Sequence, residues 1–147
     1  GCGGEPDIDH SHPNRQEEVK KANNGKGVDR LGGMVSAPVA NKNLEAAKIL
    51  GRIVNVGRHG GNKGEFNYDL HAMKRIDYIG VTNRTRSPEE LNEVTRRMRE
   101  DLWPAVEAGK LSLPIDKTFP LDQVADALAR MRSNQHFGKI VPVVQWA

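Results

Sequence analysis

Two short apolar runs in the middle of the chain predict neighbouring buried strands. The first run lies within residues 51–57 and the second within residues 76–81, and a helix-like segment over residues 67–74 separates them. Short runs rich in β-branched residues and joined through a helix are typical of buried parallel strands with a crossover connection. Ligands bind beyond the carboxyl ends of such strands, so we expect a ligand edge at residues 57–61 and 82–84.

The second half of the chain shows apolar residues at helical spacing. Ser87 with Glu90 three residues later forms a capping box, which predicts the start of a helix. The apolar stripe of this helix is expected to be buried, and it consists of Leu91, Val94, Met98 and Leu102. A second amphipathic helix is predicted over residues 121–131, between extended segments at 111–119 and 139–144. This order of elements predicts an α/β fold with a partial parallel sheet and flanking helices.

The elements in the first third of the chain follow weaker signals. Pro13 is expected at the first position of a polar helix that runs to about Ala22. A strand is predicted over residues 28–35, although its interior glycines weaken it. Asn41 is expected to cap a helix that ends at Gly51, just before the first of the two central strands.

Length and composition limit the class of protein. The chain of 147 residues has the length of one domain, with 37% hydrophobic and 28% charged residues. No apolar run approaches the roughly 20 residues that span a bilayer. The first residues lack the basic start and the apolar stretch of a signal peptide, so we expect a cytoplasmic protein with no membrane partner. The single cysteine, Cys2, excludes an internal disulfide and a zinc cage of several thiolates.

The basic balance of the chain does not by itself indicate a nucleic-acid partner. The net charge is +3 and the pI is about 9.1. However, Arg96, Arg97 and Arg99 lie among glutamates, as on a solvated helix face. Two Tyr, two Trp and three Phe are too few for a platform on which bases stack, and Trp103 is expected to pack in the core. We therefore predict no nucleic-acid partner.

The histidines are the candidates for metal binding and for proton transfer. His10 and His12 form an H-x-H pair, but two imidazoles without a thiolate or a set of carboxylates are more typical of a polar loop than of a metal site. His59 and His71 could act as acid or base, although a histidine in a glycine-rich turn is more often solvated. The sequence therefore predicts no metal and no catalytic side chain.

Three arginines near the predicted ligand edge could bind phosphate. Arg58, Arg84 and Arg86 have guanidinium groups that can bind oxyanions through two parallel hydrogen bonds. The alternative is that they are ordinary surface arginines. For Arg58 this alternative agrees with the sequence as well as phosphate binding does, and for Arg86 it agrees better. The chain has no G-x-G-x-x-G sequence, and residues 57–61 resemble such a loop only loosely because no long helix follows them. We therefore expect the chain to begin in the middle of a domain.

Six pieces of the sequence occur in an order and spacing that carry a resemblance. They are residues 8–10, 25–29, 51–57, 79–82, 119–121 and 137–141. Together they resemble the second half of the medium-chain dehydrogenase/reductase superfamily, in its zinc-independent quinone oxidoreductase branch. The resemblance covers the chain from about Gly3, and it depends on the ordered set rather than on any single piece.

The resemblance implies a domain organisation. Residues 1–108 would be the later part of a Rossmann-like cofactor-binding domain, and residues 109–147 would be the segment that returns to the catalytic domain. The catalytic lobe and the glycine-rich pyrophosphate loop would lie upstream. Such a part of a protein should expose apolar surface, for example on one face of the helix at 121–131. The strand at residues 76–82 would pair with its twin across a two-fold axis, so the resemblance implies a homodimer through the sheet edge.

The resemblance also implies an activity and a set of cofactor-binding residues. Members of the branch use NADPH, with NADH possible here, to transfer hydride to a quinone or an activated double bond. The positions that match cofactor contacts are His10, Val56, Gly57, Arg58, His59, Val81, Thr82 and Asn83. Without the pyrophosphate loop, which supplies the anion site, the isolated chain is expected to be weakly active or inactive. The alternative is a non-catalytic binding or dimerisation module that kept the scaffold.

Overall fold

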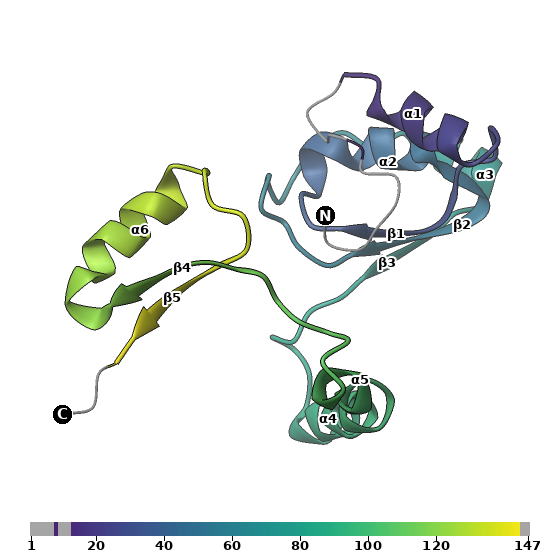
Figure 1. Cartoon of the computed structure of the whole chain (residues 1–147). Coiled ribbons are helices and arrows are strands. Elements are labelled where there is room, and N and C mark those ends of the chain that lie inside the picture. The colour runs from purple at the N-terminus through teal and green to yellow at the C-terminus, as the bar shows by residue number, and fades with distance from the viewer. Residues whose placement is uncertain (1–7, 9–12, 145–147) are drawn as a thin grey trace. The chain divides into compact units, whose positions relative to one another are not determined.

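The protein is described here by a computed structural model, which covers residue 8 and residues 13–144. The chain forms two compact units, Gly1–Arg86 and Ser87–Ala147 (Figure 1). The division at this point differs from the boundary expected between residues 108 and 109, and the assignment of those two parts to two dehydrogenase domains stays a prediction. The first unit contains, in chain order, α1 (Arg15–Ala22), β1 (Val28–Gly33), the 3-10 helix η1 (Ala37–Val39), α2 (Ala40–Ala46), β2 (Ala47–Asn55), α3 (Tyr68–Lys74) and β3 (Asp77–Gly80).

The first unit is built on a parallel sheet of three strands in the order β1-β2-β3. The two central strands and the crossover helix between them are therefore confirmed, and so is the α/β fold. Leu31 of β1, Ile53 of β2 and Tyr78 of β3 stand side by side across the sheet. At the carboxyl ends, Asn55 of β2 is aligned with Gly33 of β1 and Gly80 of β3, so the loops that follow start from one edge.

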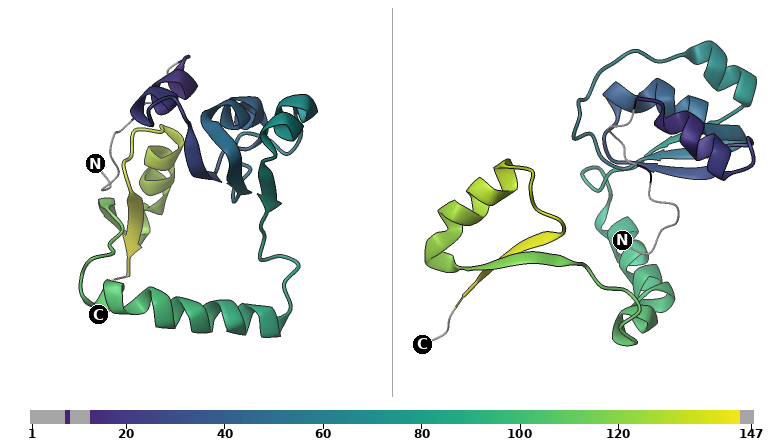
Figure 2. Two further views of the ribbon diagram at one scale, coloured as in Figure 1. Left: turned by 90° about the vertical axis from the view of Figure 1, so that its right-hand side faces the viewer. Right: turned by 45° about the horizontal axis from the view of Figure 1, so that its top comes forward.

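Helices α1, α2 and α3 lie on one face of this sheet, as Figures 1 and 2 show. The core between the helices and the sheet is formed by buried Leu44, Ala47, Ile53 and Ile76, with Leu31, Phe66, Leu70 and Tyr78 packed against them. Arg52 and Asp77 are aligned on the other face, where they form an exposed ion pair of 3.1 Å. The strands were expected to be buried, but in the described part of the chain only the face that carries the helices is covered.

Two predicted helix boundaries in this unit are wrong. Helix α1 begins at Arg15, with Asn14 as its N-cap residue, rather than at Pro13. Helix α2 ends at Ala46 rather than at Gly51, because the chain from Ala47 onward pairs with β1 and extends β2. Asn41 does not cap α2; its side-chain oxygen accepts a hydrogen bond of 2.8 Å from the backbone N–H of Asn67 instead. The helix at Asn67 is confirmed, with the Asn67 side chain capping α3.

The pairing of β1 with β2 contains an irregularity between Val28 and Arg30, beside a strained residue of β2. Leu50 has φ +60° and an exposed side chain. A left-handed backbone costs an ordinary L-residue roughly 1–2 kcal/mol, and asparagine tolerates it better. We expect Leu50→Asn to raise the free energy of unfolding by about 1 kcal/mol, as measured by urea denaturation. Ile49→Asn removes a similarly exposed apolar side chain (56% against 64% for Leu50) without the positive φ. An equal gain in stability from both variants would contradict backbone strain at Leu50 as the cause.

The second unit contains a helical pair and a small sheet. Its elements are α4 (Pro88–Asp101), α5 (Trp103–Glu107), β4 (Ile115–Pro120), the 3-10 helix η2 (Leu121–Gln123), α6 (Val124–Arg132) and β5 (Lys139–Val143). The capping box at α4 is confirmed, since Ser87 Oγ accepts from the Glu90 N–H and a Glu90 carboxylate oxygen accepts from the Ser87 N–H. Strands β4 and β5 are parallel, and α6 connects them.

The apolar stripes of the second unit are exposed. The stripe of α4 was expected to be buried, but Leu91 is 39% exposed and Leu102 is 50% exposed, so that prediction is wrong for the described structure. Trp103 is also half exposed rather than in the core, and its indole N–H donates to Glu107. The expected exposure of the helix at residues 121–131 is confirmed, because its large apolar side chains are all exposed. None of the helices in the described ranges is long and apolar enough to cross a membrane.

An ion pair joins the sheet of the second unit to its helix. Both carboxylate oxygens of Asp116 accept from the guanidinium of Arg130, at 2.5 and 2.8 Å, and one of them also accepts from the Phe137 N–H. These hydrogen bonds lower the pKa of Asp116 to about 2, with the contact to Arg130 as the main cause. The stabilisation that this carboxylate provides is therefore complete above the ordinary Asp pKa and is lost as the pH falls from about 4 towards 2.

We accordingly expect Asp116→Asn to lower the free energy of unfolding of the second unit at neutral pH. Below pH 4 the difference in this free energy between the variant and the parent chain should become steadily smaller. Urea denaturation followed by circular dichroism at several pH values would measure this. Asp126→Asn is the matched control, because Asp126 lies in the same unit and forms no ion pair with a described residue. A pH-independent effect of Asp116→Asn would show that packing, not the charge, is what the substitution disturbs.

Candidate functional site

The carboxyl ends of β2 and β3 open into a hollow with a volume of about 690 Å³. It is lined by Met34, Val56, Gly57, Arg58, His59, Asn62, Val81, Thr82, Asn83 and Arg84. Every residue that the sequence proposed for cofactor binding lies in this lining, except His10, which is outside the described residues. Two loops that are separate in the sequence therefore meet at the carboxyl ends of the parallel strands, where ligands are expected to bind. Their role in binding a cofactor stays a prediction.

The first loop of the hollow is held by backbone hydrogen bonds. The N–H groups of Val56 and Gly57 both donate to the Gly33 carbonyl oxygen, at 2.9 and 3.0 Å. Further along, the N–H of His59 donates to the Met34 carbonyl, and that of Gly60 donates to the Val35 carbonyl. The loop thus continues to pair with the segment after β1, well past the end of β2.

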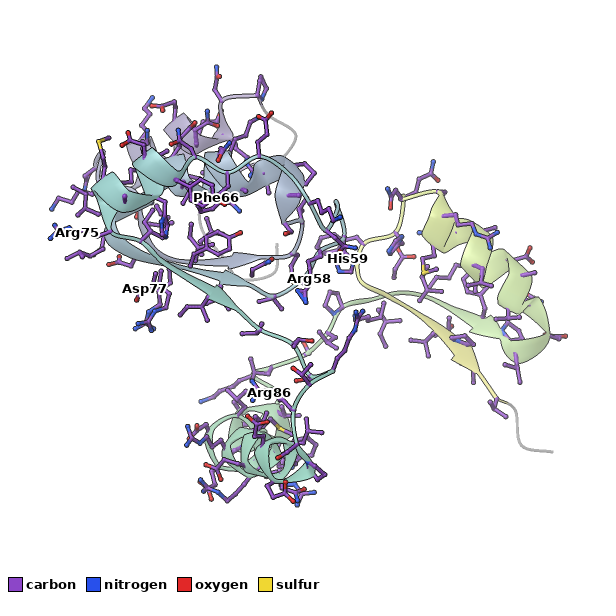
Figure 3. All side chains as sticks on the ribbon, turned by 180° about the vertical axis from the view of Figure 1, so that it is seen from behind. Arg58, His59, Phe66, Arg75, Asp77 and Arg86 are labelled. Atoms are coloured by element: carbon purple, nitrogen blue, oxygen red, sulfur yellow. The ribbon has the colours of Figure 1, made fainter. Side chains whose placement is uncertain are left out.

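Two glycines make this close pairing possible. A Cβ atom on Gly57 would lie 2.6 Å from the Met34 carbonyl oxygen, and one on Gly60 would lie 2.7 Å from a methyl group of Val35. Real Cβ atoms do not approach other atoms so closely, so a side chain at Gly57 would force the two backbone segments apart, and one at Gly60 would require Val35 to shift. Arg58 and His59 stand between these two glycines with exposed side chains, and Figure 3 shows them together at the strand end.

The second loop is ordered by shorter-range contacts. The Val81 N–H donates to the Asn55 carbonyl at 3.4 Å, which keeps the end of β3 beside β2. The Thr82 hydroxyl oxygen accepts from the Arg84 N–H at 3.2 Å, as in a turn stabilised by a threonine side chain. The Arg86 N–H donates to the Asn83 carbonyl, so the chain turns immediately after the hollow. This turn places Asn83 and Arg84 at the rim.

The hollow contains lining residues that the sequence did not assign to the cofactor. Arg84 was considered as a phosphate ligand, and the structure places it in the lining together with Arg58. Met34 comes directly after β1. It would have been found if residues beyond the carboxyl end of that strand had also been considered. Asn62 lies in the glycine-rich loop, and nothing in the sequence distinguishes it. Arg86, the third candidate phosphate ligand, does not line the hollow.

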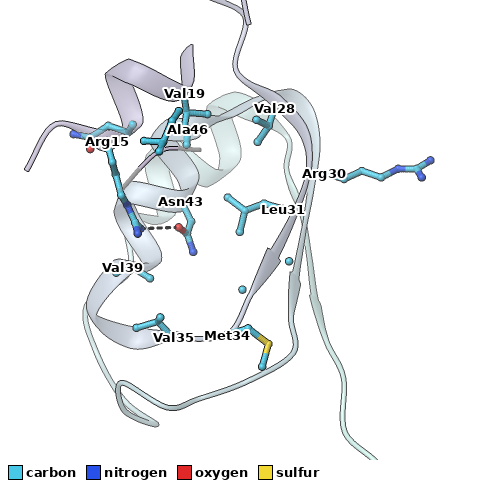
Figure 4. A pocket seen from close by; sticks show the side chains of 14 residues that line it. Arg15, Val19, Val28, Arg30, Leu31, Met34, Val35, Val39, Asn43 and Ala46 are labelled. Atoms are coloured by element: carbon cyan, nitrogen blue, oxygen red, sulfur yellow. Dashed lines mark hydrogen bonds between the residues drawn. The ribbon is translucent and has the colours of Figure 1, made fainter. Parts of the chain in front are cut away.

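A second cavity of about 470 Å³ lies among α1, α2 and β1 (Figure 4). Its walls are mostly apolar, with Val19, Leu31 and Val39 among them. Arg15 and Asn43 face each other in it, and Arg15 donates to the Asn43 side-chain oxygen at 3.2 Å, whereas the Gln16 side-chain oxygen is buried without a hydrogen-bond partner among the described residues. This arrangement is typical of incomplete packing between helix and sheet, and it offers fewer free polar groups than the hollow at the strand ends.

The described residues do not fit a protein-built metal site. No group of three or more His, Cys, Asp or Glu side chains comes together among them. Within the same residues, His71 lies on α3 with its ring 5.4 Å from that of Phe66, away from the hollow that contains His59. A zinc site needs three or four such ligands, so no chemical step is assigned to a metal here.

Comparison with known proteins agrees with this fold. A family model described as "Zinc-binding dehydrogenase" matches residues 7–141. Phthioceranic/hydroxyphthioceranic acid synthase of Mycobacterium tuberculosis (strain ATCC 25618 / H37Rv) is 28% identical over 142 residues, which cover 91% of this chain and 6% of the synthase. The chain thus spans only a small part of that curated relative, whose overall activity does not transfer to it directly.

Solved structures share the fold at low identity. An NAD-dependent alcohol dehydrogenase superposes with a TM-score of 0.71 at 24% identity, over 95% of this chain and 37% of that chain. The quinone oxidoreductase of Pseudomonas syringae pv. Tomato DC3000 gives 0.70 at 19% identity, over 92% and 42%. CurK enoyl reductase gives 0.64 at 24% identity, over 89% and 39%. At these identities the likeness shows a shared fold only.

The family model gives the stronger result, because it covers nearly all of the chain. It agrees with the Rossmann-like parallel sheet and with the resemblance found in the sequence. The "zinc-binding" in the family's description has no counterpart among the described residues, which do not fit such a site. The chain belongs to the family described as "Zinc-binding dehydrogenase", within the medium-chain dehydrogenase/reductase superfamily.

Proposed function

We propose that this chain is the cofactor-binding part of an NAD(P)H-dependent oxidoreductase, with the hollow at the strand ends as the nicotinamide end of its site. The observation that carries the proposal is the meeting of residues 56–59 and 81–83 in one hollow. In a parallel α/β sheet this edge is where ligands bind. Membership of a dehydrogenase family supports a nicotinamide cofactor there.

The lining residues fit such a cofactor by their chemistry. Val56 and Val81 supply apolar surface for the nicotinamide ring, while the Thr82 hydroxyl and the Asn83 amide can exchange hydrogen bonds with a carboxamide or a ribose hydroxyl. The bound cofactor supplies the hydride, which passes to a quinone or an activated double bond. The residues of this chain bind and orient the cofactor and shield it from water; none of them is assigned as acid or base.

The finer parts of the proposal follow the family pattern. NADPH is the proposed cofactor, with NADH as the second possibility, and His10 is the proposed contact near the adenosine phosphate. The proposed assembly is a homodimer through β3, which is an edge strand of its sheet. A cytoplasmic location is proposed as well. Sedimentation of the chain would test the dimer, and a monomer at all concentrations would contradict it.

Titration of the chain with NADPH, and with NADH in parallel, tests the function. Following nicotinamide fluorescence, we expect weak, saturable binding of NADPH that His10→Ala weakens. Turnover with a quinone is expected to be slight, because the chain lacks a pyrophosphate-binding glycine-rich loop. His71→Ala is the matched control, since His71 lies outside the hollow. An absence of binding at millimolar cofactor would refute the proposal.

The second candidate is a non-catalytic binding or dimerisation module. The position of β3 at the edge of the described sheet and the exposed apolar stripe of α4 favour this candidate, because such surfaces readily acquire a partner. It predicts self-association without any affinity for nicotinamide cofactors. The NADPH titration and the sedimentation experiment together separate the two candidates.

A further inference from the structure

The lining of the hollow contains basic but no acidic side chains. Arg58, His59 and Arg84 contribute basic groups to its lining, which contains no aspartate or glutamate. Neither Arg58 nor Arg84 forms an ion pair with a carboxylate of the described residues. By contrast, Arg52 is paired with Asp77 on the open face of the same sheet. The strand-end arginines are therefore available to a negatively charged ligand.

Both arginines are carried by backbone that is fixed by hydrogen bonds. Arg58 stands in the loop whose amides bond to Gly33, Met34 and Val35, and Arg84 follows the turn closed by Thr82. Two arginines that line one hollow from separate, hydrogen-bonded loops can bind an oxyanion with little loss of backbone entropy. The backbones of both arginines are therefore held in place, and their exposed side chains are open to a ligand in the hollow.

The position of the pair points to the hydride acceptor. Under the proposed function, residues 56–59 and 81–83 hold the nicotinamide end of the cofactor. The acceptor must come within about 3–3.5 Å of the reacting nicotinamide carbon, so it occupies the same hollow. Arg58 and Arg84 are then among the groups nearest to the acceptor, and a neutral quinone would leave both unpaired.

We propose that Arg58 and Arg84 make the site selective for an acceptor that carries a carboxylate, namely an α,β-unsaturated acid. This inference rests on the proposed function and specifies its substrate class. Reduction adds hydride from NAD(P)H to the β-carbon and a proton from water to the α-carbon; the double bond becomes single and the cofactor is oxidised. An ionised carboxylate normally opposes hydride addition. Pairing it with guanidinium groups offsets its charge and stabilises the negative charge that develops in the transition state.

NMR titration of the ¹⁵N-labelled chain tests this without requiring turnover. The probes are crotonate and its neutral counterpart crotonamide, which differ in charge but hardly in shape. Crotonate is expected to shift the amides of residues 57–60 and 82–84 in a saturable way, and crotonamide to bind about tenfold more weakly. Arg58→Gln and Arg84→Gln should each lower the affinity of the chain for crotonate about tenfold. Arg132→Gln, an exposed arginine of the second unit, should have no effect.

A parallel titration of the same variants with NADPH distinguishes the possible outcomes. If crotonate and crotonamide bind with equal affinity, or if they shift the amide signals of residues elsewhere, the inference is wrong. The proposed function is then judged by NADPH binding alone. If the arginine variants weaken NADPH and crotonate does not bind, the guanidinium groups serve a cofactor phosphate and the inference is overturned. If crotonate binds as expected but NADPH does not, the anion site is supported and the proposed function fails.

Discussion

Replacement of Lys74 by methionine is expected to destabilise the first unit by about 3 kcal/mol. The ammonium group of Lys74, at the end of α3, donates to the carbonyl oxygens of Leu44, Glu45 and Ala47 at 2.7–2.8 Å. These carbonyls lie where α2 ends and β2 begins, where helical carbonyls have no partner within the helix. Methionine keeps the aliphatic length of the side chain but leaves all three acceptors without this donor.

The location of Lys74 makes the effect large. Burial lowers the pKa of Lys74, so its ammonium group is partly removed from water where it stands. One hydrogen bond to a charged group contributes about 1.5–3 kcal/mol net of solvent. The three bonds share a single, only part-buried ammonium group, and water can reach the freed carbonyls, so the expected loss is about 3 kcal/mol rather than the sum of three separate bonds. The same contacts join α3 to the junction of α2 and β2, which explains how the chain can pass directly from a helix into a strand at Ala47.

Urea denaturation of Lys74→Met against the parent chain would measure this loss. Lys63→Met is the matched control, because Lys63 is an exposed lysine of the same unit. Surface substitutions of that kind change stability by only about 0.5 kcal/mol. Equal stabilities of the two variants would show that the three carbonyl contacts contribute little in solution.

Replacement of Gly57 by alanine is expected to lower stability by about 2–3 kcal/mol and to remove cofactor binding. The new Cβ would lie 2.6 Å from the Met34 carbonyl oxygen, which is a backbone atom and cannot rotate away. Relief requires the loop to separate from the segment after β1. That movement would break the hydrogen bond from Gly57 to Gly33 and displace Arg58 and His59 from the hollow.

Gly80→Ala is the control for this prediction. Gly80 lies at the end of β3, beside the same edge, but a Cβ there would meet nothing within 4 Å. We expect it to leave the stability within about 0.5 kcal/mol of the parent chain and the NADPH titration unchanged. If Gly57→Ala and Gly80→Ala behave alike in both measurements, the close approach of the loop to Met34 is not required for the site.

The site was largely predictable because one rule of topology applies to it. Short β-branched runs with a helix between them indicate parallel strands, and parallel strands end at the same edge. That rule leads from the amino-acid sequence alone to Gly57, Arg58 and Asn83. It does not lead to Asn62, whose place in the hollow depends on the path of a loop with no regular pattern.

Errors in the predicted elements arose where tertiary pairing overrides a local signal. The apolar residues before Gly51 have helical spacing, yet α2 stops at Ala46 because the next residues pair with β1. The periodicity of α4 correctly predicted a helix. The predicted burial of its apolar stripe was wrong, because Leu91 and Leu102 are exposed. Periodicity indicates which face is apolar, and only the surrounding structure determines whether that face is covered.

The sequence by itself determined the parallel α/β class, the capped start of α4 and the two loops that form the hollow. Each of these features is signalled by a segment of about a dozen residues, in which spacing and turn chemistry act directly. Only the tertiary structure decided the role of Lys74 and which of the three candidate arginines line the hollow. Lys74 and Leu44 are 30 positions apart, and contacts over such separations depend on how the helices pack on the sheet.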